Sequence, residues 1–163
     1  MEVWDAYNAN ENLAGCDLVR GKAIPKGLFR IVCQILVLHV DGSYLLMQRD
    51  FNKECYPGMF EATAGGSALK GETPIVAALR ELKEETGITS AELTQINKTL
   101  SDNTIFYQYL CVTNCEKTSI TLQEGETISY RWISKDDFLI FMNTSECIPT
   151  QRDRLVSYLE NIS

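Results

Sequence analysis

The sequence contains a single histidine, His39, and none of its six cysteines lies in a Cys-x-x-Cys pair. Zinc sites in proteins usually combine closely spaced cysteines with histidines, so no zinc centre is expected. His39 falls within a predicted strand and is expected to have no ligand role. We interpret the scattered cysteines as reduced thiols, which is typical of a cytoplasmic protein.

Long apolar runs and an excess of basic residues are also missing. No apolar stretch reaches the roughly 18 residues of a membrane span, and residues 1–12 lack the basic-then-apolar order of a signal peptide. We therefore expect a cytoplasmic protein without a membrane partner. The formal net charge of -7 argues against a nucleic-acid partner, because binding to a phosphate backbone requires a basic surface. The negative charge is compatible with a phosphorylated small-molecule substrate, since divalent cations can link phosphates to acidic groups.

The 163 residues, 45% of them hydrophobic, predict one globular domain over residues 1–163. Its first part, residues 1–29, is expected to be a hairpin-like extension. Short runs rich in branched apolar residues predict strands at Val3–Tyr7, Cys16–Arg20, Arg30–Val40, Tyr44–Arg49, Phe60–Ala64, Leu93–Leu100, Ile105–Val112 and Ile128–Ile133. Helices are predicted at Pro74–Thr86, Lys135–Met142 and Gln151–Asn161. Strands interleaved with few helices favour an α/β or α+β sandwich.

Three carboxylates stand close together on the predicted helix Pro74–Thr86, which Gly87 is expected to end. Glu84 and Glu85 follow Glu81 by three and four residues, so all three lie within an arc of roughly 100°. A hard divalent cation such as Mg²⁺ binds oxygen ligands and turns their mutual repulsion into attraction. An adjoining apolar stripe is expected to pack on a sheet: Ile75, Ala78, Leu79 and Leu82. The alternative is a solvated acidic helix face.

The segment around these acids resembles the signature of Nudix hydrolases, Gly-x5-Glu-x7-Arg-Glu-apolar-x-Glu-Glu-x-Gly-apolar. Residues 66–88 match it without departure, through Gly66, Glu72, Arg80, Glu81, Leu82, Glu84, Glu85, Gly87 and Ile88. The resemblance implies an α/β fold of the Nudix type, an α/β/α sandwich with a mixed β-sheet. It also implies hydrolysis of a diphosphate linkage by metal-assisted attack of water, with Mg²⁺ as the cofactor and Mn²⁺ as an alternative.

The resemblance also assigns roles to individual residues. The implied metal ligands are Glu81, Glu84, Glu85 and the backbone carbonyl of Gly65. A structural role within this signature, the Nudix box of residues 66–88, is implied for Glu72, Arg80, Gly66 and Gly87. The general base is expected to be a box glutamate, Glu81 or Glu84, or an acid of the loop Gln123–Glu126. Glu126 is expected to act as a ligand or base, with a solvated loop glutamate as the alternative.

Basic residues near the end of a predicted strand are expected to contact the substrate. Arg49 and Lys53 follow the strand Tyr44–Arg49, and Arg30 begins another. Each could equally be a surface charge. The expected partner is a small-molecule diphosphate, and the protein is expected to be a monomer or a homodimer.

Similarity beyond the box points to the isopentenyl-diphosphate-isomerase-like branch of the family. It rests on Trp4-Asp5-Ala6-Tyr7, Gly15, Arg20-Gly21, the run Leu45–Arg49, Lys53 and Pro57-Gly58. Such isomerases have a cysteine-glycine-histidine-proline run before a degraded box, whereas this chain has Ala64-Gly65-Gly66-Ser67 before an intact one. We therefore favour hydrolysis over isomerisation. A non-catalytic ligand-binding module is the third interpretation, and the retained glutamates argue against it.

Overall fold

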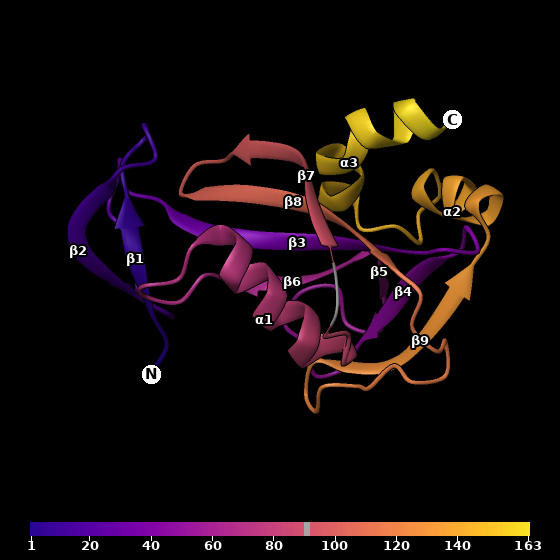
Figure 1. The fold of residues 1–163 in the computed structure, drawn as a ribbon. Coiled ribbons are helices and arrows are strands. Elements are labelled where there is room, and N and C mark those ends of the chain that lie inside the picture. The colour runs from indigo at the N-terminus through magenta and orange to yellow at the C-terminus, as the bar shows by residue number, and fades with distance from the viewer. Residues whose placement is uncertain (90–91) are drawn as a thin grey trace.

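The computed structural model describes residues 1–89 and 92–163, and the fold is built around one mixed sheet (Figure 1). Its central strand β3 (Arg30–His39) runs parallel to β8 (Thr104–Thr113) and antiparallel to β6 (Thr63–Ser67). The other strands are β1 (Val3–Tyr7), β2 (Leu13–Val19), β4 (Tyr44–Arg49), β5 (Phe60–Glu61), β7 (Glu92–Leu100) and β9 (Thr127–Ile133). The helices are α1 (Pro74–Thr86), α2 (Lys135–Met142) and α3 (Pro149–Ile162).

Two antiparallel extensions complete the sheet. Strand β7 pairs with the outer side of β8, while β4 pairs with both β5 and β9. Strands β3 and β4 meet only at Leu38 and Tyr44, beside the turn that connects them. The sheet therefore opens between β6 and the β4 group, and the cavity described below lies along this part of the sheet.

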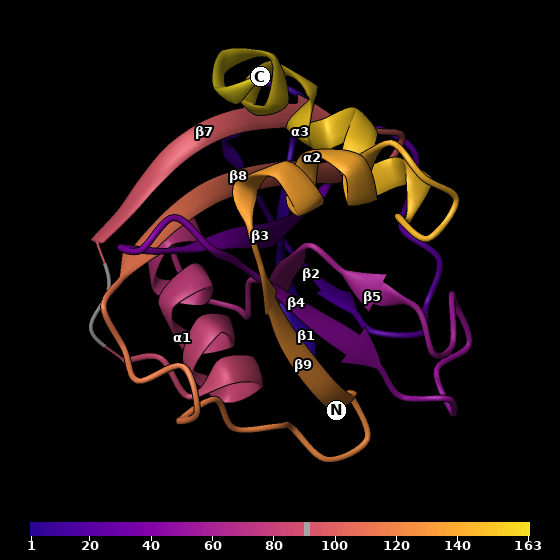
Figure 2. The same ribbon diagram turned by 90° about the vertical axis from the view of Figure 1, so that its right-hand side faces the viewer.

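Helices cover both faces of the sheet, as Figures 1 and 2 show. Because successive side chains of a strand point to opposite faces, Ile35 faces the α1 side and Leu36 faces the α2 and α3 side. Each face has its own apolar core, with Leu82 of α1 in one and Phe138 of α2 in the other. The predicted α/β fold with a mixed sheet is confirmed. None of the helices in the described ranges is long and apolar enough to cross a membrane.

The N-terminal hairpin β1–β2 forms a separate sheet at the end of the molecule away from α2 and α3 (Figure 1). Trp4 and Leu18 are buried in a small core of their own. The hairpin is fastened to the loop before α1, where Lys70 donates its backbone N–H to Val3 O at 2.9 Å and Gly71 donates to Asp5 Oδ2 at 2.7 Å. These contacts place the hairpin beside the segment that leads into the acidic helix.

Several predicted boundaries shift. Strand β2 begins at Leu13 rather than Cys16, and α3 begins at Pro149 rather than Gln151. The single strand predicted at Phe60–Ala64 is wrong, because the chain changes partner from β4 to β3 at Ala62. At that break the Ala62 N–H donates to the Gln151 side chain at 2.8 Å. Strand β6 then continues through the two glycines that had been expected to follow it.

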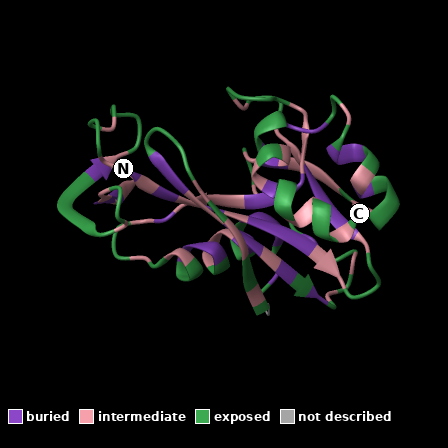
Figure 3. Cartoon of the chain, turned by 90° about the horizontal axis from the view of Figure 1, so that it is seen from above, coloured by how far each residue is buried: buried purple, intermediate pink, exposed green. Residues whose placement is uncertain are grey.

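Helix α1 begins and ends as predicted, but its buried face is rotated. The Thr73 side chain caps its first turn and Gly87 ends it at a φ of 80°. Its buried residues are Ala77, Ala78, Leu82, Glu85 and Thr86, whereas Ile75 and Leu79 of the predicted stripe are 38% and 40% exposed. The alanines let the helix lie close to the sheet, which turns Glu85 inward. Figure 3 shows the buried and exposed sides of this helix.

Candidate active site

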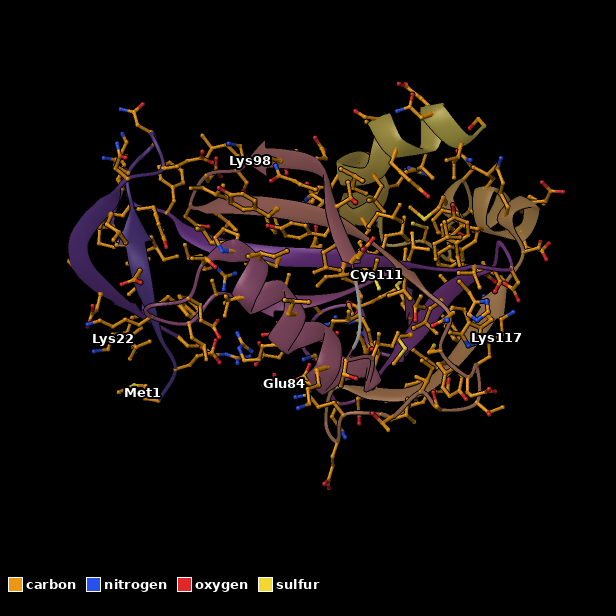
Figure 4. All side chains as sticks on the ribbon, in the orientation of Figure 1. Met1, Lys22, Glu84, Lys98, Cys111 and Lys117 are labelled. Atoms are coloured by element: carbon orange, nitrogen blue, oxygen red, sulfur yellow. The ribbon has the colours of Figure 1, made fainter. Side chains whose placement is uncertain are left out.

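A cavity of about 1010 Å³ lies between α1, strand β6, the loop before β9 and the N-terminal hairpin. Six carboxylates line it: Glu2, Glu61, Glu81, Glu84, Glu85 and Glu126. Figure 4 labels Glu84 near the lower end of α1, on the same side of the molecule as Met1 and Lys22, which also line the cavity. The cavity therefore joins the acidic end of α1 to the N-terminal hairpin.

Glu85 is the most deeply buried of these acids, with 8% of its surface exposed. It reaches from α1 to β6, where Oε2 accepts a hydrogen bond from the Gly65 N–H at 3.0 Å. Burial raises the pKa of Glu85 well above its usual range, and the neighbouring carboxylate of Glu61 raises it further. A buried carboxylate beside other carboxylates is unfavourable unless a positive charge compensates it. The site is therefore electrostatically suited to a cation.

Arg80 connects α1 to the loop that precedes it. Its guanidinium donates to both oxygens of Glu72, at 2.7 and 2.9 Å, and to the backbone oxygen of Ser67 at 3.0 Å. Glu72 also accepts from the Leu69 N–H at 2.8 Å. The hydrogen bonds from Arg80 are the main cause of the lowered pKa of Glu72, so this carboxylate is held in its charged form.

The same guanidinium holds two of the acids expected to bind metal. Arg80 Nη1 lies 2.7 Å from Glu81 Oε1 and 3.2 Å from Glu84 Oε2. Burial raises the pKa of Glu81, although the bond from Arg80 opposes this effect. In this arrangement no three His, Cys, Asp or Glu side chains of residues 1–89 and 92–163 surround a metal position. Arg80 therefore engages one carboxylate oxygen of Glu81 and one of Glu84 in this structure.

The donor set still fits a hard divalent cation. All the acids supply oxygen, which Mg²⁺ prefers, and the raised pKa values of Glu81 and Glu85 reflect a cost that a bound cation would remove. Gly66 leaves room for the carboxylate of Glu81, because a Cβ atom at this position would lie 2.6 Å from Glu81 Oε1. Gly66 thus allows Glu81 to approach the backbone of β6, and Glu85 bonds to the same strand through the Gly65 N–H.

The three predicted substrate-binding cations all line the cavity. Arg49 forms an ion pair with Glu61, and Lys53 forms one with Glu126. The guanidinium of Arg30 lies over the ring of Trp4, 4.6 Å from its centroid, and donates to the hydroxyl of Ser67. Two of the cations are therefore engaged by acids of the same cavity, and a phosphate that contacts them would compete with those acids.

Sequence reasoning missed Glu61. This residue belongs to β5 and follows Phe60 and precedes the buried Ala62. Burial raises its pKa, and the nearby Arg49 only partly opposes the shift. An acid among apolar residues in a predicted strand was the available signal, because such residues are rarely buried without a partner.

His39 and the cysteines, for which no metal-binding role is expected, make contacts within the fold. The ring Nε2 of His39 lies 3.0 Å from the backbone oxygen of Cys115, outside the cavity. All six cysteines are free thiols. Burial raises the pKa of the Cys33 thiol to about 12, so it is protonated at neutral pH.

Comparison with known proteins gives a family match. The profile of the NUDIX domain matches residues 28–151. An uncharacterised Nudix hydrolase of Listeria monocytogenes is 32% identical over 151 residues, which are 91% of this chain and 89% of that protein. An ADP-ribose pyrophosphatase of Bacillus subtilis is 28% identical over 150 residues, which are 88% of this chain and 80% of that protein.

Solved structures agree on the architecture. A crystal structure from Deinococcus radiodurans has a TM-score of 0.69 at 16% identity and covers 85% of this chain and 87% of that chain. Such a likeness shows the fold alone. A weaker sequence match, to an isopentenyl-diphosphate Delta-isomerase of Serratia proteamaculans, is 32% identical over 96 residues, 59% of this chain and 52% of that protein. The resemblance of the N-terminal part to this branch is therefore confirmed.

Proposed function

Because this chain belongs to the Nudix family of hydrolases, we propose that it is a Mg²⁺-dependent pyrophosphohydrolase. Its substrate would be a nucleoside diphosphate derivative or a related diphosphate, cleaved by attack of water. The observation that carries this proposal is the burial of Glu85 beside Glu61 and Glu81 in the wall of a cavity large enough for a small molecule. The ADP-ribose pyrophosphatase relative supports the same class of substrate.

In this proposal Glu81, Glu84, Glu85 and the carbonyl of Gly65 hold the ion, with Mn²⁺ as an alternative to Mg²⁺. The bound ion would supply positive charge for the diphosphate oxygens and lower the pKa of a coordinated water. Arg80 and Glu72 would hold the loop and the helix in place, and Gly66 and Gly87 would allow the backbone conformation that this arrangement needs. Arg80 would keep its bonds to Glu72 and Ser67 when the other acids leave it.

The proton of the attacking water needs an acceptor. We assign this role to Glu84 or Glu126, whose side chains are 43% and 37% exposed while lining the cavity. Glu81 is the third candidate, although it is more buried. A base must lie within hydrogen-bonding reach of the water, and an exposed cavity residue can move to meet it. Glu126 would release Lys53 for the substrate phosphates in the same movement.

The remaining parts of the proposal concern the whole chain. We propose that residues 1–163 act as one Nudix domain, because the hairpin of residues 1–29 lines the same cavity as the box of residues 66–88. We also propose a cytoplasmic monomer or homodimer. Isomerisation has less support, because the described residues that line the cavity include neither a cysteine nor a histidine for proton transfer.

A substrate panel with Mg²⁺ tests the proposal. It contains nucleoside di- and triphosphates, nucleotide sugars, dinucleotides and prenyl diphosphates. We expect hydrolysis of at least one member, with release of a monophosphate and loss of activity in EDTA. Folded protein that turns over no member would contradict the hydrolase function and favour a binding module. Deuterium incorporation from heavy water into isopentenyl diphosphate would instead support the isomerase.

The Lys53→Met variant tests the basic side of the cavity. We expect KM to rise about tenfold and kcat to change less than about threefold, because the variant loses one charge-assisted phosphate contact. The effect is limited because Glu126 competes for the lysine. Steady-state kinetics on the best substrate of the panel measure it. Lys135→Met, which removes an exposed lysine of α2, is the matched control. Equal KM values for the two variants would contradict the assignment.

A further inference from the structure

A row of uncharged polar groups crosses the sheet from the acidic part of the cavity. It starts at Gly65, whose N–H donates to Glu85. Gly65 pairs in register with Gln34 of β3, and Gln34 pairs with Gln108 of β8. Gln108 Nε2 donates to Gln34 Oε1 at 3.1 Å. The row therefore leads from a carboxylate to two amides at one level of three adjacent strands.

This part of the sheet has hydrogen-bonding capacity that nothing in the described residues uses. Thr63 Oγ1 and Gln108 Oε1 are buried atoms without a partner there, although Thr63 and Gln108 are only 5% and 0% exposed. Thr63 pairs with Leu36, two residues from Gln34, so Thr63 and Gln34 project from the same face. Both line the cavity. A buried hydroxyl that lacks a partner is costly, and a ligand that bonds to it removes that cost.

We propose that Thr63 and Gln34 form a subsite for the uncharged polar group joined to the diphosphate of the substrate. Gln108 lies behind Gln34 and positions its amide. This inference rests on the proposed function and specifies its substrate class, diphosphates of nucleosides or sugars rather than of prenyl alcohols. Hydroxyl or amide groups on the ligand give Thr63 Oγ1 the partner that it lacks and add a contact for the amide of Gln34, which already bonds to Gln108. An alkyl chain leaves the Thr63 hydroxyl unpaired.

A matched control is available within the chain. Thr99 of β7 also has a buried Oγ1 without a partner among the described residues, but it does not line the cavity. Thr99→Val and Thr63→Val make the same chemical change in two strands of one sheet. Thr63→Ser keeps the hydroxyl. Comparison of these variants therefore distinguishes a specific role of the Thr63 hydroxyl from the general effect of removing a buried hydroxyl.

Equilibrium binding by calorimetry in Mg²⁺ tests the subsite without requiring turnover. The probes share a phosphate and differ in the attached group: the four nucleoside 5′-monophosphates, glucose 1-phosphate and isopentenyl phosphate. We expect at least one nucleoside or sugar phosphate to bind about tenfold more tightly than isopentenyl phosphate. Thr63→Val should weaken the binding of that probe about three- to tenfold, the range for one neutral hydrogen bond. Thr63→Ser and Thr99→Val should change its affinity less than about twofold.

Three results would overturn the subsite: isopentenyl phosphate binding as tightly as every polar probe, an unchanged affinity in Thr63→Val, or no binding of any probe. The attached group that Thr63→Val affects identifies the source, nucleoside or sugar. If the binding pattern holds while no diphosphate is hydrolysed, the hydrolase function fails and the subsite stands. If hydrolysis occurs while Thr63→Val binds the probes as tightly as the wild type does, the hydrolase function stands and the subsite fails.

Discussion

Replacing Glu85 by glutamine is expected to lower kcat/KM about a thousandfold, which corresponds to roughly 4 kcal/mol of transition-state stabilisation. The change removes the charge of a proposed metal ligand but keeps its size and an oxygen for the Gly65 N–H. Without metal the same variant should be more stable than the wild type, because a neutral amide replaces a buried carboxylate whose pKa is raised. Loss of activity with a gain in stability separates this result from misfolding.

Two measurements check the prediction. Thermal unfolding in EDTA should show a higher Tm for Glu85→Gln than for the wild type, because the buried carboxylate with a raised pKa is gone. Added Mg²⁺ should raise the Tm of the wild type, since a ligand of the folded state stabilises it, but should raise that of Glu85→Gln much less. Glu160→Gln, an exposed carboxylate of α3, should match the wild type in both. A variant that keeps its activity and its Mg²⁺ response would contradict the proposed ligand.

The sequence was informative wherever local chemistry decides the structure. Helix α1 begins and ends where Thr73 and Gly87 predicted, because a cap and a left-handed glycine act within one turn. Tertiary packing decided the rest. Periodicity predicted that Ile75, Ala78, Leu79 and Leu82 would pack on the sheet. Ala78 and Leu82 are buried as predicted, whereas Ile75 and Leu79 are partly exposed and Ala77 faces the sheet instead, because small side chains allow a close approach. At the break between β5 and β6, the Ala62 N–H bonds to Gln151, 89 positions away in the sequence, and no local pattern predicts this contact.

The same distinction holds for the site. The spacing of the box predicted that Glu81, Glu84 and Glu85 would lie near one another on a helix. It did not predict that Arg80 would hold two of them, because this depends on side-chain conformation. Glu61 was missed since strand β5 brings it to the site through pairing with β4, a contact between distant segments. The clustering of the acids of one helix was thus predictable, whereas the acid contributed by β5 was not.

The two adjacent glycines of β6 should respond in opposite ways to alanine. In Gly65→Ala the new Cβ would lie 1.9 Å from the backbone oxygen of Cys33, and the φ of 154° at Gly65 is itself unfavourable for alanine. Strand β3 is central and cannot give way easily. We expect a loss of about 3 kcal/mol, or about 9 °C in Tm, because the strain falls on backbone atoms. Denaturant and thermal unfolding measure it.

In Gly66→Ala the new Cβ would meet only the carboxylate of Glu81, the flexible end of a side chain. The protein should therefore unfold within about 2 °C of the wild type while kcat falls about 10- to 100-fold, because the displaced acid is a proposed metal ligand. Gly65→Ala serves as the comparison, since both variants add one methyl group to the same strand. If Gly66→Ala lost stability like Gly65→Ala, or kept full activity, Glu81 would not need the space beside Gly66 to bind metal.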